Sequence, residues 1–568
     1  MIIFYAHQFL GEGTVINKSD SISDSIYGRV EINDIEKKVI DSAAFQRLRN
    51  IKQLGLCELV FPGAVHSRFS HSIGVMHVAG KYFDAIFQKI PQDSQLSADL
   101  KQLRRIFRLT ALLHDVGHGP FSHLFEHMLV YHDKTENRLI RCTADYLKGT
   151  TFGIPEKWIK AEKIRSYFDK QLEHEHYSLA IIREIFSGQV QDESLPNDIA
   201  QSICCLMDED IELSETVEKI LTSLRTGFLS SRSISDDKKS TLDKKKEVES
   251  LRKCIKSMIS GEFDADRIDY LARDAQHCGV RLAAGDVDYL LGTLSLQYEP
   301  ERPKSELEFS KNQNPPQNFY LLMEKTGVRP FEQLLMARKQ VFDIVYSHRI
   351  NDSFGRLLEI VVEDILKQNH SKHATQVASV APLHGAPKTA AEFLRMTDDW
   401  LGRQVEAVAN NSDGYFSEQA VTAARMIVTR TPLVRIPTSE AEVFLEDLED
   451  RENQIKEEHK NNCLIIPRKL KELTKLSRDN ARYDSEILRI QVRGQASRSI
   501  NVSAASELLN STLFTKVKVR LFAFETLTKS AELQALPQRF KQWQGLSEAP
   551  VPAEEAHAAR STTLTEPH

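Results

Sequence analysis

The stretch Thr110-Ala-Leu-Leu-His-Asp-Val-Gly-His-Gly-Pro-Phe-Ser-His123 places three histidines and one aspartate within ten positions, counted from His114. Its apolar beginning predicts a buried helix, and the glycines and proline that follow predict where that helix ends. In a regular helix of about 3.6 residues per turn, the adjacent His114 and Asp115 would point about 100° apart. A helix end lets both side chains reach one cation, and the turn after it directs the two later histidines back to the same place. The stretch therefore predicts a metal site at the end of a helix.

Length and composition indicate a large cytoplasmic protein. With 568 residues the chain exceeds the roughly 250–300 residues that one core usually serves, so we expect two or three units. A formal net charge of −6 provides no overall basic field for nucleic acid or a membrane surface, and nucleic-acid contact is left open only for the charged segment 230–246. The seven cysteines include no Cys-x-x-Cys pair, which argues against a disulfide framework or a thiolate zinc site. Since no uncharged run reaches the roughly 18 residues of a membrane span, we expect no membrane partner.

The periodicity of apolar residues predicts a mainly α fold with small β elements at the N-terminus and in the C-terminal region. Residues 1–32 are expected to form strands and turns, followed by a helical core over 33–367 with a flexible insertion at 230–246. Residues 391–545 are expected to form a C-terminal accessory region, and 546–568 a disordered tail. A strand is expected at 306–309, another at 515–522, and one long or broken helix over 331–367. The remaining predicted helices cover 72–90, 98–115, 175–187, 197–207, 215–228, 246–260 and 263–276.

Two further segments can complete a metal site, since a mononuclear site needs about four protein ligands. One is Arg68-Phe-Ser-His-Ser-Ile-Gly74, in which His71 precedes an apolar helix, and the other is Phe263-Asp-Ala-Asp-Arg-Ile-Asp-Tyr270 with its three aspartates. Imidazole and carboxylate ligands together suit iron, manganese, zinc or magnesium, and two imidazoles make a site for magnesium alone less natural. The residues leave the identity of the metal open.

Together these segments resemble the HD-domain phosphohydrolases, and within them the deoxynucleoside triphosphate (dNTP) triphosphohydrolases of the sterile-alpha-motif-associated and bacterial kinds. The resemblance covers about residues 24–350 and concerns the catalytic module alone, with no sterile-alpha-motif domain expected before it. It implies an HD-domain helical core. Besides the segments already quoted, the matching motifs are Tyr27-Gly28, the run from Asp41 to Leu54, Phe61-Pro-Gly-Ala64, His174-Glu-His-Tyr-Ser178 and Ala272-Arg-Asp274.

The resemblance implies one divalent transition metal per subunit, namely manganese, iron, zinc, cobalt or nickel, with magnesium on the substrate phosphates as an addition. The implied ligands are His71, His114, Asp115 and Asp266. Among the three aspartates of the 263–270 segment, Asp266 is the expected ligand, so that Asp264 and Asp269 are expected to support the site or the fold.

The resemblance also implies a catalytic group around the α-phosphate. His118, His123 and His174 would surround the phosphate, and Glu126, where the family usually has aspartate, would orient His174. This pairing makes chemical sense because a protonated imidazole can donate to a departing ribose oxygen while a carboxylate fixes its tautomer. The implied reaction is attack of a water molecule on the α-phosphorus, with release of a deoxynucleoside and an intact triphosphate.

Further residues are assigned to the substrate and to a regulatory nucleotide by the same resemblance. Arg68, Arg267 and Arg338 are the expected phosphate clamps, since a guanidinium binds phosphate oxygens in a planar fork. The expected sugar pocket consists of Gln53, Leu54, Tyr270, Asp274 and Tyr346. Homo-oligomers, dimeric or tetrameric and activated by nucleotides, are implied as well. The positions matching those that read an activating base are Asp41, Gln46 and Arg49.

The sequence thus predicts an HD-domain metalloenzyme that hydrolyses dNTPs to deoxynucleoside and inorganic triphosphate, under nucleotide regulation, for control of dNTP pools or for defence against phage. One alternative is an HD-type nuclease or nucleoside monophosphatase, which would release nucleotides or inorganic phosphate. Another alternative is a nucleotide-sensing regulatory protein that binds nucleotides through residues 41–49 and signals through residues 391–545.

Overall fold

The structure is a computed structural model that describes part of the chain. Strand 306–309, the tail 546–568 and residues 1–19 of the predicted N-terminal strands lie outside the described residues. The described residues are 20–126, 129–133, 138–190, 192–234, 236, 239–261, 263–282, 286–299, 318–369, 386–411, 414–444, 464–467, 488–491, 499–501 and 516–523.

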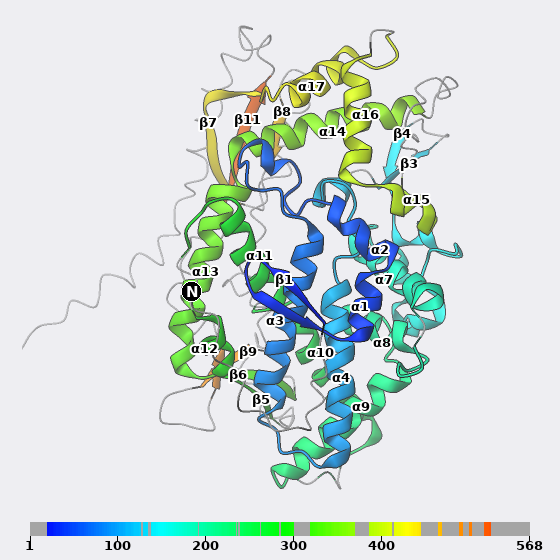
Figure 1. Ribbon diagram of the computed structural model, residues 1–568, viewed down its shortest axis with the longest axis vertical. Coiled ribbons are helices and arrows are strands. Elements are labelled where there is room, and N and C mark those ends of the chain that lie inside the picture. The colour runs from blue at the N-terminus through cyan, green and yellow to red at the C-terminus, as the bar shows by residue number, and fades with distance from the viewer. Residues whose placement is uncertain are drawn as a thin grey trace, which may run out of the picture.

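Two long helices, α3 (Arg68–Phe87) and α4 (Ser94–Leu113), pack side by side at the centre of the molecule (Figure 1). The side chain of Asp93 accepts a hydrogen bond from the backbone N–H of Leu96 and so begins α4, as expected of an N-cap aspartate. Helix α3 begins at Arg68, so His71 lies in its first turn and not before the helix as predicted. The apolar pattern starts only at residue 73, because the polar residues of this turn face the site described below.

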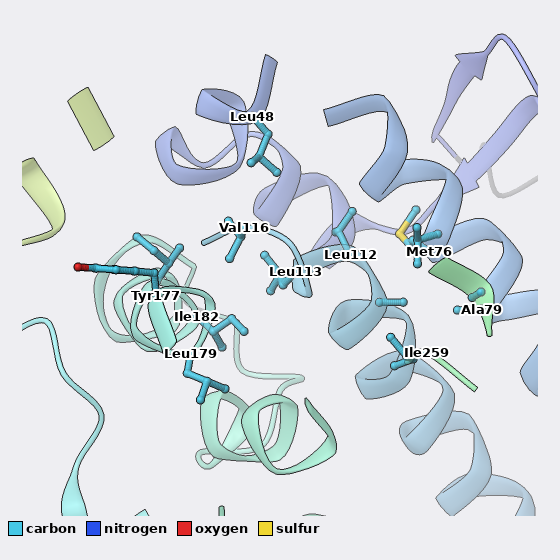
Figure 2. Packing of buried hydrophobic residues seen from close by; sticks show 14 of the residues in the cluster. Leu48, Met76, Ala79, Leu112, Leu113, Val116, Tyr177, Leu179, Ile182 and Ile259 are labelled. Carbon is cyan, nitrogen blue, oxygen red and sulfur yellow. The ribbon is translucent and has the colours of Figure 1, made fainter. Parts of the chain in front are cut away.

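Helices from the middle of the chain surround this pair. The structure places α11 (Ala265–His277) against α3, and α8 (Ile199–Met207) and α9 (Glu215–Ser231) against α4. Helix α7 (His174–Glu184) packs on α8, and α10 (Thr241–Ser257) packs on α9. In Figure 2, Leu113 at the end of α4 and Val116 just after it lie on the side toward Ile182 of α7, and all three are buried. The turn after α4 is held against α7 by the hydrogen bond from Gly117 to Ser178.

Shorter elements precede and connect these helices. Strands β1 (Asp20–Asp24) and β2 (Gly28–Ile32) form an antiparallel hairpin, which leads into α1 (Asp34–Ile40), α2 (Ala43–Gln46) and the 3-10 turns η1 (Arg47–Asn50) and η2 (Gly55–Leu59). After α4 come α5 (His123–Glu126), the antiparallel pair β3 (Val130–Asp133) and β4 (Arg138–Arg141), η3 (Ala144–Leu147), η4 (Glu156–Trp158), η5 (Ala161–Lys163) and α6 (Ile164–Phe168). The π-helical turn η6 (Ile185–Gln189) ends α7.

The C-terminal half adds helices and two small sheets. Its helical elements are α12 (Val287–Gly292), η8 (Lys325–Gly327), α13 (Val328–Val341), the π-helical turn η9 (Phe342–Tyr346), α14 (Arg349–Asn369), α15 (Ala390–Arg395), α16 (Asp398–Ala409) and α17 (Glu418–Val428). One sheet has the order β10-β9-β6-β5 and the other β7-β11-β8. Their strands are β5 (Leu294–Tyr298), β6 (Phe319–Met323), β7 (Val434–Phe444), β8 (Leu464–Pro467), β9 (Leu488–Gln491), β10 (Ser499–Asn501) and β11 (Lys516–Ala523).

The predicted mainly helical fold with small β elements is confirmed. The region 331–367, predicted as one long or broken helix, is broken at η9. Helix α10 begins earlier than predicted, at Thr241, because the Ser240 hydroxyl accepts from the N–H of Asp243. Helices α16 and α17 pack on α14 and share its apolar core, although the domain division at residue 391 stays a prediction. Among the described residues, no helix has the length and apolar character that crossing a bilayer requires.

Candidate active site

The His114–His123 segment leaves α4 and turns tightly against α7. Gly117 lies in this turn, where a Cβ atom would be only 2.2 Å from both the carbonyl oxygen of His174 and the backbone nitrogen of Ser178. The Ser178 hydroxyl accepts from the N–H of Gly117 at 2.9 Å and donates to the carbonyl of His114 at 2.8 Å. The absence of a side chain at Gly117 thus lets the start of α7 approach the turn and brings His174 to it.

One cluster joins three helices. His71 from α3, His114 at the end of α4 and Asp266 from the first turn of α11 each offer a ligand atom, all within 4.8 Å of one another. Oδ1 of Asp266 lies 3.0 Å from Nε2 of His71 and 3.7 Å from Nε2 of His114. Both Nε2 atoms are buried and make no hydrogen bond to any residue that the structure describes. Buried imidazole nitrogens facing a carboxylate are a donor set that fits a transition-metal cation.

Asp115, the fourth predicted ligand, lies beside this cluster. Its Oδ1 is 3.3 Å from Nε2 of His114, and its Oδ2 is 3.6 Å from Nε2 of His71 and accepts a hydrogen bond from Nη1 of Arg68. Burial by itself raises the pKa of Asp115, but the charges of His114, Arg68 and His118 hold that pKa well below its usual range. The carboxylate is therefore ionised and within reach of a cation. The four-ligand set as a whole stays a prediction.

A buried carboxylate behind His71 fixes the orientation of its ring. Oδ2 of Asp269 lies 2.8 Å from Nδ1 of His71, and Arg273 donates to both carboxylate oxygens of Asp269 at 2.9 Å. Arg273 also donates to Asp24 of the N-terminal hairpin at 2.9 Å. Gly74 makes room for this group, because a Cβ there would lie 1.8 Å from Oδ1 of Asp269. Asp269 thus supports His71 and leaves the Nε2 atom of His71 facing the cluster.

Asp264 has a different role from the other two aspartates of its segment. It is the N-cap of α11, and its side chain accepts from the N–H groups of Arg267 at 2.7 Å and Gly261 at 2.6 Å. These bonds set the start of α11 and therefore the position of Asp266, two residues later.

A second cluster consists of His118, His123 and His174. The rings of His118 and His174 are stacked, with centroids 3.7 Å apart, and the ring of His123 meets both edge-on at 5.1 and 5.6 Å. Oε1 of Glu126 lies 2.5 Å from Nδ1 of His174 and 3.3 Å from Nδ1 of His123. Asp115 connects the two clusters, since its Oδ1 is also 3.5 Å from Nε2 of His118.

The histidines of the second cluster differ in their affinity for protons. Burial lowers the pKa of His174, but Glu126 and then the charges of Glu175 and Asp115 outweigh burial and raise it above the usual value. Burial lowers the pKa of His118 strongly, and the charge of Arg68 adds to the effect. The cluster therefore places a readily protonated imidazole, His174, beside one that favours the neutral form, an arrangement suited to general acid catalysis.

The predicted phosphate clamps lie around the two clusters. Arg68 reaches Asp115 through Nη1 and donates from Nε to the hydroxyl of Ser122 at 2.8 Å. Burial raises the pKa of Tyr270 to about 12, although the charges of Arg338 and Arg267 lower it, so both guanidinium groups are close enough to act on this hydroxyl. The three arginines come from different elements, Arg68 from α3, Arg267 from α11 and Arg338 from α13.

The predicted sugar-pocket residues include a connected polar group. The hydroxyl of Tyr346 donates to Oδ2 of Asp274, and the rings of Tyr346 and Tyr270 are 6.4 Å apart. Oδ1 of Asp274 lies 2.8 Å from Nε2 of His66, whose ring stacks on His277. Sequence analysis did not single out His66, and its place two residues before Arg68 is the signal that could have indicated it.

Gln53 and Leu54 lie between η1 and η2. The backbone N–H of Gln53 donates to the carbonyl of His66 at 3.0 Å, which brings this segment to the Asp274 group. The Oε1 atom of Gln53 is buried and bonds to no residue that the structure describes, so it offers an acceptor for a ligand hydroxyl. Leu54 packs on the core as a partly buried side chain.

Two of the three residues predicted to bind a regulatory nucleotide contact each other. Nε of Arg49 donates to Oε1 of Gln46 at 2.8 Å, and the Arg49 guanidinium lies 3.6 Å from the centre of the Phe69 ring. Asp41 follows α1 as its C-cap, with its N–H bonded to the carbonyl of Lys37 at 2.8 Å. Their binding of a nucleotide stays a prediction.

Comparisons with known proteins agree with this geometry. Residues 68–225 match the HD domain family. The chain is 49% identical over 108 residues to the deoxynucleoside triphosphate triphosphohydrolase SAMHD1 homolog of Dictyostelium discoideum, covering 19% of this chain and 20% of that protein. It is 26% identical over 373 residues to the uncharacterized protein YwfO of Bacillus subtilis, covering 65% of this chain and 60% of that protein. The predicted resemblance to HD-domain dNTPases is therefore confirmed over the aligned parts.

A solved structure shares the fold. A phosphohydrolase from Bacteroides thetaiotaomicron matches 88% of this chain and 99% of its own, with a TM-score of 0.54 and 17% sequence identity. At this identity the likeness concerns the fold alone. The HD match covers residues 68–225, and the aligned parts span only 20% and 60% of the two relatives named above.

Proposed function

We propose that this protein is a metal-dependent phosphohydrolase that cleaves dNTPs into a deoxynucleoside and inorganic triphosphate. The proposal rests on the contact between two clusters. One consists of the potential metal ligands His71, His114 and Asp266, and the other of His118, His123 and His174. Asp115 joins them, because its carboxylate oxygens lie 3.6 Å from Nε2 of His71 and 3.5 Å from Nε2 of His118. The dNTPase name of the Dictyostelium relative supports the choice of substrate.

The proposed metal ligands are His71, His114, Asp115 and Asp266. A divalent transition metal bound there, whether manganese, iron, zinc, cobalt or nickel, would act as a Lewis acid on a phosphoryl oxygen. Asp269 holds the ring of His71 so that Nε2 is presented to the ion, and Arg68 pairs with Asp115 until a cation or phosphate competes for it.

The proposed acid is His174. Its raised pKa keeps it protonated beside Glu126, and it would donate this proton to the departing ribose oxygen. His118, which favours the neutral form, and His123 would contact the α-phosphate oxygens. Arg68, Arg267 and Arg338 would hold the triphosphate, because their positive charge balances the negative charge of its phosphate oxygens.

The proposed sugar site is formed by Gln53, Leu54, Tyr270, Asp274 and Tyr346. Asp274 accepts from Tyr346 and is held by His66, so its carboxylate is fixed in place for a ribose hydroxyl. A site with fixed polar partners can discriminate strongly between substrates that differ in one hydroxyl group, because an unmatched buried group is costly.

The direct test is anion-exchange analysis of the products after incubation of purified, metal-supplemented protein with each dNTP singly and with all four together. Triphosphate and deoxynucleoside are the expected products. Release of inorganic phosphate or of nucleotides would instead identify a monophosphatase or nuclease, and four intact dNTPs with manganese, magnesium, cobalt or iron would overturn the proposal. Nucleotide-dependent assembly without turnover would then favour a sensor.

Nucleotide regulation and homo-oligomer formation extend this proposal. Their basis is the match of Asp41, Gln46 and Arg49 to activator-binding positions. Turnover seen only in the dNTP mixture, together with a dimer or tetramer by light scattering, would support them. Turnover of single dNTPs by a monomer at the same rate as in the mixture would overturn them. Control of dNTP pools and defence against phage are the two proposed purposes, separable by phage plating on cells with and without the gene.

The role of His174 can be separated from metal binding. His174→Gln is expected to lower turnover by about a hundredfold or more, within the range for a general acid, while the metal content is unchanged. Loss of metal from this variant would mean that His174 is a ligand.

A further inference from the structure

The turn that carries the catalytic histidines has an unusual backbone. Phe121 and Ser122, between His118 and His123, both have positive φ angles, 55° and 59°. Residues with a Cβ atom rarely adopt this conformation, and it persists only where the surrounding structure holds it. Hydrogen bonds from two distant parts of the chain hold this turn.

Asp398, in the first turn of α16, holds it from the C-terminal side of the chain. Its Oδ1 atom accepts from the N–H of Phe121 at 2.7 Å, and its Oδ2 atom accepts from the N–H of Lys52 at 2.9 Å. The side chain is buried, with 5% of the residue exposed. Burial raises the pKa of Asp398 to about 6, against the effect of these two N–H groups, so it is ionised at neutral pH. Only an ionised carboxylate offers both oxygens purely as acceptors.

Arg47 provides a second connection between this turn and the start of α16. Its Nη1 atom donates to the carbonyl of His118 at 2.7 Å, and Nε and Nη2 donate to the carbonyl of Met396 at 3.1 and 2.7 Å. Its guanidinium carbon also lies 4.2 Å from the centre of the Phe393 ring. Arg47 thus ties the backbone of a catalytic-site histidine to the segment between α15 and α16.

The same turn also positions Arg68. The hydroxyl of Ser122 accepts from Nε of Arg68 at 2.8 Å and donates to the carbonyl of Lys52 at 2.7 Å. Arg68 then reaches Asp115 through Nη1. A displacement of the turn would therefore move the histidines and the arginine together.

We propose that Asp398 and Arg47 are positioning residues of the active site, so that the segment Met396–Asp398 belongs to the catalytic architecture and not to a separate accessory region. The inference rests on the proposed function for its kinetic part only. Neither side chain needs to touch substrate, because both act through backbone atoms of the turn. A misplacement of about 1 Å can lower turnover about a hundredfold, so a modest shift of this turn has a large effect.

The test compares Asp398→Asn with Asp399→Asn in the full chain. Asp399 is the next residue of the same helix turn and is exposed, so its replacement removes the same charge without touching the turn. In D398N the amide nitrogen of the introduced asparagine cannot accept a hydrogen bond, and one of the two N–H bonds is lost. We expect kcat for dNTP hydrolysis to fall about ten- to a hundredfold in D398N, with KM within about twofold and metal content unchanged, and no change in D399N.

Hydrogen exchange gives a readout that does not depend on turnover. The peptide containing Phe121 is expected to exchange faster in D398N than in wild type or D399N. Unchanged exchange would overturn the inference, and so would faster exchange with an unchanged kcat, which would reduce Asp398 to a purely structural role. If the wild-type protein hydrolyses no dNTP, the proposed function fails, while the exchange comparison still decides whether Asp398 holds the turn.

Arg47→Lys provides a second variant in case D398N does not fold. Lysine keeps the charge but cannot bridge two carbonyl groups with a planar fork. It is expected to lower kcat and to leave metal content unchanged, and a kcat equal to that of wild type would overturn the role of Arg47.

Discussion

The Nδ1 atom of His71 lies 2.8 Å from the Oδ2 atom of Asp269, and both side chains are completely buried. Because Asp269 is also held by Arg273 through two bonds of 2.9 Å, the carboxylate cannot rotate away from the histidine. The histidine therefore donates from Nδ1 and keeps Nε2 available for a cation. This relationship leads to the first prediction.

Asp269→Asn is expected to weaken metal binding by about ten- to a hundredfold, as is typical when the partner of a metal-binding histidine is changed. The amide is a weaker acceptor and no longer fixes the tautomer of His71. Metal affinity can be measured by titration of the chelator-treated protein, with Asp288→Asn, an exposed partner of Lys81, as the control. An affinity equal to that of wild type would show that Asp269 serves only the fold.

His114→Ala is expected to remove the metal and, with it, the hydrolytic activity, while the fold is retained. Metal content by mass spectrometry and helicity by circular dichroism check the two parts of this prediction. His77→Ala is a suitable control, because His77 lies on α3 outside both clusters, with its ring tilted against that of Tyr27 at a centroid distance of 5.0 Å. Full turnover by a metal-poor His114→Ala protein would contradict the assigned ligand role.

Glu126→Gln is expected to shift the alkaline limb of the pH profile of kcat to lower pH. In the native protein Glu126 opposes the effect of burial and helps to raise the pKa of His174, so the imidazole stays protonated above its usual titration range and loses its proton only as the pH rises through this raised pKa. The contribution of the His174–Glu126 pair to the free energy of unfolding changes in the same direction. It is present at low pH and is lost as the pH rises through the folded-state pKa of His174. Without the Glu126 charge, His174 should lose its proton at a lower pH.

The control for this pH experiment is Glu184→Gln, which removes the same charge near the far end of α7. Its profile should coincide with that of wild type. An unshifted alkaline limb in Glu126→Gln would mean that another group is the proton donor.

Gly117→Ala is expected to lower the free energy of unfolding by about 1–3 kcal/mol, since added volume in a tightly packed place forces its neighbours apart. The new methyl group would lie 2.2 Å from backbone atoms of His174 and Ser178, and these cannot move without shifting α7. Thermal or urea unfolding measures the effect, and kcat should fall with it because His174 is displaced.

Gly402→Ala is the matched control for Gly117→Ala. Gly402 lies within α16, and a Cβ there meets no described atom within 4 Å. Alanine in a helix interior is usually more favourable than glycine by about 0.5–1 kcal/mol, so this variant should be unchanged or slightly more stable. An equal loss of stability in both variants would contradict the close packing assigned to Gly117.

Much of the helical core could be predicted because its signals are local. The apolar spacing that marks α8 and α9 lies within one segment, and the break after α4 follows from the glycines and proline of a single turn. Helices α3 and α10 begin several residues before the predicted starts, because their first turns contain polar residues and give no apolar pattern. In α3 these polar residues face the site. In α10 Ser240 caps a charged turn that faces solvent.

The residues of the candidate site were visible in the sequence to very different degrees. The pairs His114/Asp115 and His118/His123 belong to one continuous stretch. The residue pattern also indicated His71 and an aspartate of the 263–270 segment, and the resemblance to a family selected Asp266 and added His174. Asp398 carries no such signal: it bonds to Phe121 across 277 positions, and an aspartate at the start of a helix is otherwise explained as a favourable helix-dipole residue.

By itself the sequence determined the mainly helical fold class, the turn that ends α4, and the residue types from which a metal and phosphate site can be made, because all of these depend on neighbours along the chain. Only the tertiary structure decided that Asp269 bonds to His71 while Asp264 caps α11, that His66 holds Asp274, and that Asp398 and Arg47 hold the turn. These choices depend on which distant side chains share the interior, where each buried charge or hydrogen-bonding group must find its partner.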